Sequence, residues 1–217
     1  MICRRMRWAK LIVRLCGQNT RVCSAEMVLS QEAIENVLRD AVSASGMPGG
    51  QLCVSLGDQI FFAQAGFANL ASQMPVTTET RFQLGSTTKP MIAYLAHLLA
   101  GEGDLDLNRP VSDYLVGDER VAWLEGRPIT TQMLLSHRSG LCGDAFLDLG
   151  SGHEAEAALV EEIGKIETLH APGEDTSYCN VGFVLCGYLL EAISGRHWTR
   201  LFRDRIADPL SSLTFDP

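Results

Sequence analysis

Ser86 and Lys89 are the two residues whose types and spacing suggest chemistry. They stand three positions apart at the start of a long apolar run, "STTKPMIAYLAHLLA". If a helix begins near Ser86, the two side chains lie one turn apart on the same face. Burial and the positive end of the helix dipole both favour an uncharged amine there. The spacing therefore predicts a general base beside a nucleophilic hydroxyl, and the Ser86 backbone N–H can face a developing oxyanion.

The same spacing also has a purely structural interpretation. Ser86 would then be a helix N-cap, and the Lys89 side chain would extend from the first turn into solvent. A serine and a lysine at this spacing are expected about once by chance in a chain of this length. The pair needs support from elsewhere in the sequence.

Tyr178, Cys179 and Asn180 form the second candidate group. They follow a Pro-Gly turn and precede an apolar segment. In an extended segment alternate side chains point the same way, so Tyr178 and Asn180 would face one cleft and Cys179 the protein. The alternatives are a buried Tyr178 phenol bonded to backbone and an Asn180 that caps the next helix.

The elements that must position these residues change type along the chain. Residues 30–46 predict a helix that is capped by Ser30 and ended by Gly46. Residues 51–56 and 59–65 predict a hairpin that turns at Gly57 and Asp58. The inward stripe expected for the helix contains Ile34, Val37, Leu38, Ala41 and Val42.

After Ser86 the pattern is almost wholly helical. Residues 91–100 have no polar face except His97, which predicts a helix buried all round. Further helices are expected at 130–137, 152–166, 180–194 and from 198 onward. The fold class expected is α/β (α+β): the N-terminal helix and hairpin of an antiparallel sheet, then an all-helical block.

Composition limits the functions open to this chain. It has 217 residues, 46% of them hydrophobic, and a net charge of −8, which disfavours nucleic acid or an anionic membrane as partner. No run approaches the roughly 18 apolar residues of a membrane span. The seven cysteines include no C-x-x-C pair, so we expect no metal or redox site and a reducing compartment.

The N-terminal arm differs from the rest. Residues 1–25 hold six basic residues and no acid. We interpret residues 1–27 as either a basic leader or a non-native extension, and exclude them from the fold. Location stays open, with the cytoplasm favoured over export or an organelle.

Several segments, in order, resemble the serine β-lactamase and penicillin-binding-protein superfamily, in its branch of class C β-lactamases, D,D-peptidases and esterases. The resemblance runs from about residue 28 onward, and its motifs together are specific. The segments that carry it are "TRFQLGSTTKP", "GDLDLNRPVSDYL", "ITTQMLLSHRSGL" and "HAPGEDTSYCNVGFVLCGYLLEAISG".

This resemblance implies a role for each matched residue. Ser86 would be the acylated nucleophile, Lys89 its base and Tyr178 a proton-transfer group, while Asn180 would bind the substrate amide or hold Lys89. His137 and Gly140 match a structural turn. The activity implied is a serine hydrolase that acts, without cofactor or metal, on a small ester, β-lactam or D-amino-acid peptide. The alternative is a non-catalytic remnant or ligand-binding module.

The chain also departs from the family pattern. Arg138 replaces the usual threonine, with little catalytic effect expected. Glu174 and Asp175 would repel an anionic substrate if they face the cleft; otherwise they are solvated loop acids.

The family's third motif has no counterpart before Pro217. We therefore expect residues 28–85 to be the N-terminal part of the sheet region and 86–217 the helical subdomain of a longer enzyme. Its C-terminal strands would be missing, and the fragment alone would be poorly soluble and nearly inactive.

Overall fold

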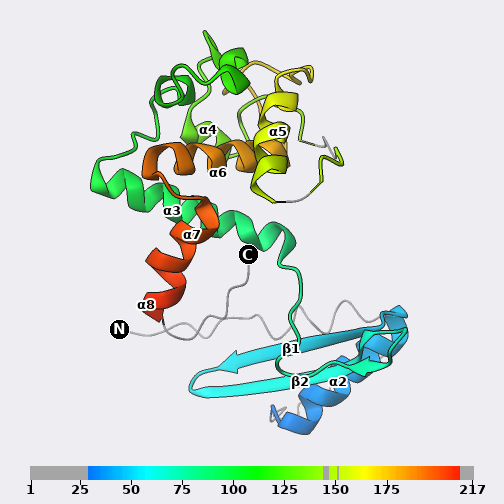
Figure 1. The fold of residues 1–217 in the computed structure, drawn as a ribbon. Helices are drawn as coiled ribbons and strands as arrows, with labels where there is room; N and C mark the ends of the chain where they lie inside the picture. Colours follow the sequence, from blue (N-terminus) through cyan, green and yellow to red (C-terminus); the bar gives the residue numbers. More distant parts are fainter. Residues whose placement is uncertain (1–28, 144–146, 151, 211–217) are drawn as a thin grey trace. The chain divides into compact units, whose positions relative to one another are not determined.

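The computed structural model describes residues 29–143, 147–150 and 152–210. The chain divides into two compact units, the first ending at Phe82 and the second beginning at Gln83 (Figure 1). Each unit has its own hydrophobic cluster. Among the helices in these ranges, none is both long and apolar enough to cross a membrane.

Helix α2 (Gln31–Ser45) opens the first unit and has the predicted ends. The Ser30 hydroxyl accepts the Ala33 N–H, and Gly46 ends the helix with a φ of 69°. Its apolar stripe is narrower than predicted, because Val37 is 54% exposed and Ala41 is also exposed. The small sheet contacts only one row of α2 side chains, at positions four residues apart. That row consists of Ile34, Leu38 and Val42.

The sheet contains three antiparallel strands in the order β1 (Gly49–Leu56), β2 (Gln59–Asn69) and β3 (Met74–Pro75). Leu56 pairs with Gln59, so the predicted two-residue turn is confirmed, and Gly57 takes the positive φ of 58° that suits its first position. Strand β3 was not predicted, since two residues are too few to show an alternating pattern. The mixed α/β class is confirmed.

The side chains on the two faces of the hairpin are buried to different extents. Side chains from one face pack with α2 around Ala63, while Ile60 and Phe62 on the other face are 60% and 54% exposed. Within the described residues the sheet is therefore covered on one side only. The partly buried members of the packed face are Leu52, Val54, Phe61 and Ala65.

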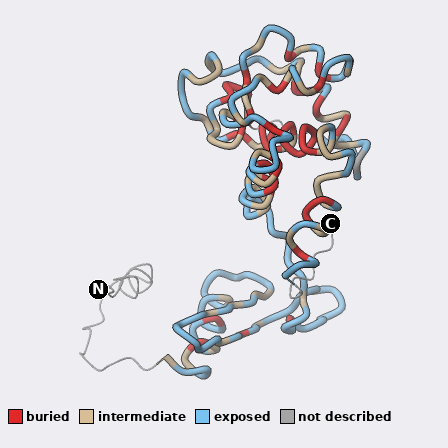
Figure 2. The backbone as a smooth tube through the Cα atoms, turned by 90° about the vertical axis from the view of Figure 1, so that its left-hand side faces the viewer, coloured by how far each residue is buried: buried red, intermediate tan, exposed pale blue. Residues whose placement is uncertain are grey.

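Helix α6 (Asn180–Ser194) is the centre of the second unit. It packs against α3 (Lys89–Glu102), α4 (Thr131–Leu135), α5 (His153–Ile163) and α7 (Trp198–Phe202), as Figure 1 shows. Figure 2 shows buried positions concentrated in this unit. The centre of the core is formed by Leu185, Cys186, Leu189 and Leu190, all fully buried.

Short turns connect these helices and extend the last one. They are η1 (Gly85–Thr88), η2 (Val111–Tyr114), η3 (Glu119–Leu124), the π-helical η4 (Arg203–Ala207) and α8 (Asp208–Leu210).

Helix α3 corrects one sequence prediction. It is not buried all round, because Tyr94 is 56% exposed and His97 is exposed as well. Within the described part of the second unit, one face of α3 packs against α6 and α7, and the apolar residues on its other face lie outside that core. The buried face consists of Ile92, Leu95, Ala96 and Leu99.

The turn after α4 depends on a glycine. Gly140 is buried with a φ of 78°, and a Cβ there would come 2.1 Å from the His170 carbonyl oxygen. The Gly140 carbonyl also accepts the Leu169 N–H at 2.8 Å. The backbone of residues 169–170 therefore lies too close for any side chain.

We predict that Gly140→Ala destabilises the second unit far more than Gly126→Ala. Gly126 has a similar φ of 73° but open space around it, so alanine there costs only the left-handed conformation, about 1–2 kcal/mol. The clash at Gly140 should raise the total to about 3 kcal/mol or more. Urea unfolding of both variants measures the difference, and equal losses would contradict the steric argument.

Candidate active site

Ser86 and Lys89 lie together at the start of α3. Ser86 belongs to η1, Lys89 is the first residue of α3, and Pro90 follows, where its missing N–H costs no helical bond. The 3-10 turn leading into the helix brings Lys89 Nζ to 3.3 Å from Ser86 Oγ. The predicted contact between amine and hydroxyl is present.

Asn180, at the start of α6, contacts the same amine. Its Oδ1 accepts a hydrogen bond from Lys89 Nζ at 2.7 Å. The alternative in which Asn180 caps α6 is wrong, because the cap is Cys179, whose Sγ accepts the Gly182 N–H at 3.2 Å. Asn180 is the first helical residue, which frees its side chain for Lys89.

Tyr178 completes the cluster from the exposed side. Its side chain is 52% exposed, which contradicts the buried-phenol alternative, and its ring centroid lies 4.8 Å from Lys89 Nζ. Hydrogen bonding by Lys89, and then by Ser86, lowers the pKa of Tyr178 below its ordinary value. Cys179 between them is only 1% exposed, so the alternation predicted from the extended segment is confirmed.

His137 holds this segment in place. Its Nδ1 accepts the Cys179 N–H at 3.0 Å, and its carbonyl accepts the Ser177 N–H at 2.9 Å. Its ring lies 4.4 Å from the Tyr178 ring, centroid to centroid, and 5.2 Å from that of Phe183. His137 adopts a positive φ of 60°, as a sharp turn requires. The motif indicated a turn here but not its contact with Tyr178.

The loop before Tyr178 is fixed by Arg138 and by its own acids. The Arg138 guanidinium donates to the Gly173 carbonyl, and the Gly173 N–H donates to the Arg138 carbonyl at 2.8 Å. The Glu174 carboxylate accepts the Ala171 N–H, and that of Asp175 accepts the Thr176 N–H. Both acids are exposed, as expected of solvated loop acids.

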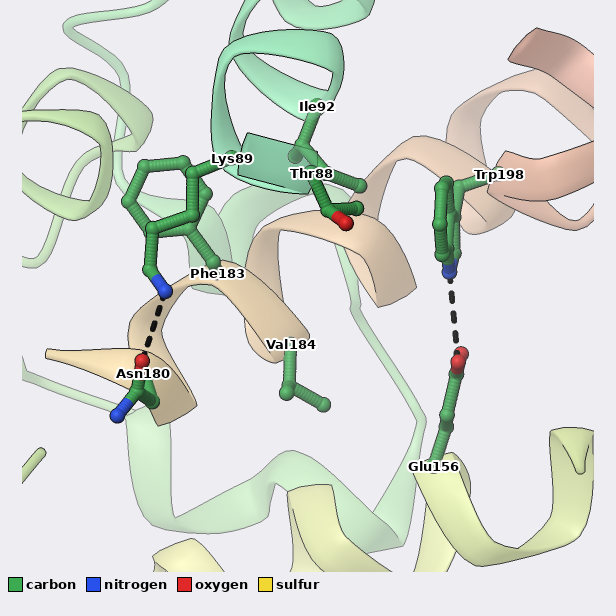
Figure 3. A pocket seen from close by; sticks show the side chains of 8 residues that line it. All are labelled: Thr88, Lys89, Ile92, Glu156, Asn180, Phe183, Val184 and Trp198. Carbon is green, nitrogen blue, oxygen red and sulfur yellow. Dashed lines mark hydrogen bonds between the residues drawn. The ribbon is translucent and has the colours of Figure 1, made fainter. Parts of the chain in front are cut away.

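A pocket of about 250 Å³ extends from Lys89 and Asn180 toward α5 and α7 (Figure 3). Of its eight lining residues, only Lys89 and Asn180 were predicted as site residues, so Glu156 and Trp198 are among those that the sequence analysis missed. Glu156 is one of several acids along α5, and nothing in its spacing distinguishes it. The lining residues are Thr88, Lys89, Ile92, Glu156, Asn180, Phe183, Val184 and Trp198.

No group of three potential metal-ligating side chains occurs in the described part of the chain. The groups that the cluster brings together are a hydroxyl, an amine, a phenol and an amide.

The environment of His137 predicts a pH dependence of stability. Burial, and then the charge of Lys89, lower the pKa of His137 below its ordinary 6.5. Between the folded and unfolded pKa values the unfolded chain binds more protons, so this contribution is complete above about pH 6.5 and is lost as the pH falls through the folded pKa.

We predict that His137→Asn removes this pH-dependent contribution. Asparagine tolerates the positive φ and keeps an acceptor for the Cys179 N–H, but it does not titrate. Urea unfolding of both proteins between pH 5 and 8 gives the difference in unfolding free energy. As the pH falls, the unfolding free energy of the wild type should decrease relative to that of His137→Asn. A difference between the two proteins that does not change with pH would contradict the assignment.

Comparison with known proteins identifies the family. The Beta-lactamase family model matches residues 34–215. Penicillin-binding protein 4 of Amycolatopsis lactamdurans is 33% identical over 168 residues, which cover 76% of this chain and 43% of that protein. An unguisins hydrolase of Aspergillus violaceofuscus is 28% identical over 186 residues, 81% of this chain and 32% of that one.

Solved structures agree with the sequence matches. The D-amino acid amidase of Ochrobactrum anthropi SV3, complexed with L-phenylalanine amide, superposes with a TM-score of 0.70 and 29% identity, over 83% of this chain and 51% of that one. The chain thus spans between about a third and a half of the length of these relatives. With most of its length matched, and with the same fold in a solved relative, the chain belongs to the β-lactamase family.

Proposed function

We propose that this chain carries the nucleophile half of a serine hydrolase that acts through an acyl-enzyme on Ser86. One observation carries the proposal: Lys89 Nζ is within hydrogen-bond distance of both Ser86 Oγ, at 3.3 Å, and Asn180 Oδ1, at 2.7 Å. An amine fixed in this way beside a hydroxyl is placed to take its proton.

In the proposed acylation, the unprotonated form of the Lys89 amine takes the proton of the Ser86 hydroxyl. The Ser86 oxygen forms a bond to the substrate carbonyl carbon as the carbonyl π electrons move to oxygen, giving a tetrahedral oxyanion. The bond to the leaving group then breaks, and that group receives the proton from Lys89 through the Tyr178 hydroxyl. The lowered pKa of Tyr178 suits it to pass a proton in either direction.

Deacylation reverses these roles. A water gives a proton to Tyr178, which passes its own proton to Lys89, and the water oxygen bonds to the carbonyl carbon of the Ser86 ester. The bond from that carbon to Ser86 Oγ then breaks, the acid leaves, and Ser86 Oγ takes the proton back from Lys89. Asn180 serves substrate binding as well as Lys89: its Oδ1 is used by Lys89, so its amide Nδ2 remains as a donor for a substrate carbonyl.

The substrate classes we propose are an ester, a β-lactam or an amide or peptide of a D-amino acid. The family and the names of its relatives, a penicillin-binding protein, an unguisins hydrolase and a D-amino acid amidase, support this range. The competing possibility is a binding module that keeps the cluster without the chemistry.

Covalent labelling tests this proposal directly. We expect a fluorophosphonate to add its mass less HF to the peptide that contains Ser86. In a separate incubation, a penicillin should add its whole mass to the same peptide, because opening of its ring releases no leaving group. Intact-mass and peptide mass spectrometry measure the adduct, with Ser86→Ala as the control that must lose it. No adduct from either reagent, with the chain folded, would support the binding module instead.

Tyr178→Phe should separate proton transfer from structure. The ring keeps its contact with His137, so we expect the free energy of unfolding to change by less than about 0.5 kcal/mol. Loss of the hydroxyl should slow acylation of Ser86 by about 10²–10⁴. Mass spectrometry of samples quenched at successive times gives the acylation rate. An unchanged rate would exclude Tyr178 from the proton transfer.

A further inference from the structure

The pocket beside the Ser86 cluster has a carboxylate at its far end. Figure 3 shows Lys89 and Asn180 joined on one side and Glu156 and Trp198 joined on the other, with Val184 between. We propose that this pocket is a subsite for an acyl group that is apolar along its length and ends in an ammonium, which Glu156 binds. This inference rests on the proposed function, because it names the substrate class for that site.

The walls of the pocket suit a hydrocarbon chain. Ile92 from α3, Phe183 and Val184 from α6, and the Trp198 indole supply apolar surface. The volume of about 250 Å³ is below the roughly 300–1,000 Å³ of pockets that hold whole drug-sized ligands. It therefore matches one side chain of a substrate rather than an entire molecule.

Glu156 is held in position by two contacts. Its Oε2 lies 2.9 Å from His197 Nε2, and its Oε1 accepts the Trp198 indole N–H at 3.4 Å. His197 Nδ1 lies 2.7 Å from Thr199 Oγ1 and 3.4 Å from the Thr199 nitrogen, so the start of α7 holds the ring with Nε2 toward the carboxylate. The two contacts fix the direction of the carboxylate.

These two contacts do not use all the acceptor sites of the Glu156 carboxylate. Two oxygens offer about four acceptor sites, and the contact of Oε1 is long. The Glu156 side chain is 37% exposed, so a ligand can reach it. The side chain is a carboxylate at the end of an apolar pocket, and an ammonium is the group that complements a carboxylate.

The two ends of the pocket differ in polarity. At one end, the Asn180 amide nitrogen is a donor that could bind a substrate carbonyl, whereas at the other end the Glu156 carboxylate is an acceptor. A substrate that fits both carries a carbonyl at one end of a short apolar chain and an ammonium at the other. The sequence analysis considered Glu174 and Asp175 as the acids that could disfavour an anionic substrate. We assign the charge selection to Glu156 instead.

Binding to the Ser86→Ala variant of the full chain tests this subsite without needing the reaction. The probes are ε-aminocaproamide and heptanamide, which have the same length and differ in an ammonium against a methyl group. We expect the ammonium probe to bind about tenfold more tightly. Titration is followed by the NMR signal of the Trp198 indole N–H, assigned with Trp198→Phe. Equal affinities would overturn the proposal.

Two further variants locate the charge responsible. In the Ser86→Ala background, Glu156→Gln should reduce the tenfold preference to about one, whereas Glu154→Gln, the same charge change on the exposed side of α5, should keep it. A preference that survives Glu156→Gln, or is lost equally in Glu154→Gln, would overturn the assignment. Labelling of Ser86 is measured separately, so a failed hydrolase and a failed subsite give different results.

Discussion

The hydrogen bond between Lys89 Nζ and Asn180 Oδ1 is the interaction on which the site depends. It joins the first residues of α3 and α6, which are 91 positions apart in the chain, at 2.7 Å. A lysine at the start of an apolar helix needs a polar partner, because an unpaired amine there would lose the hydrogen bonds of water. The two helices that carry the partners also form the core of the second unit, so packing and chemistry require the same arrangement.

A second layer of contacts keeps that bond aligned. His137 accepts the Cys179 N–H and packs against Tyr178, while Cys179 caps α6 through its sulfur. The turn that carries His137 closes only because Gly140 lets the chain pass the His170 carbonyl. Few of these supporting residues touch the place where a substrate would react, yet each one fixes a residue that does.

Local signals in the sequence predicted much of this arrangement. Ser30 and Gly46, the predicted ends of α2, are short-range features, and each acts at its expected place. The pairing of Ser86 with Lys89 follows from helix geometry, and the alternation of Tyr178 and Cys179 from extended geometry.

What the sequence could not predict depends on tertiary neighbours. The exposure of Tyr94 and Val37 reflects which helix face meets a partner, and an apolar pattern alone does not show that. Glu156 joins the pocket because α5 packs against α6 and because His197, 41 residues further along the chain, contacts its carboxylate. An Asn180 cap for α6 was one of the two alternatives drawn from the sequence. The cap is instead Cys179, a residue that is not among the usual capping types and so was not considered.

That cysteine has a consequence for chemical durability. Only the deprotonated form of a thiol reacts readily with peroxides, and burial raises the pKa of Cys179. Its sulfur is thus shielded from oxidants even though Tyr178 next to it is open to solvent. The first turn of α6 can keep its sulfur cap under oxidative stress that would attack an accessible thiol.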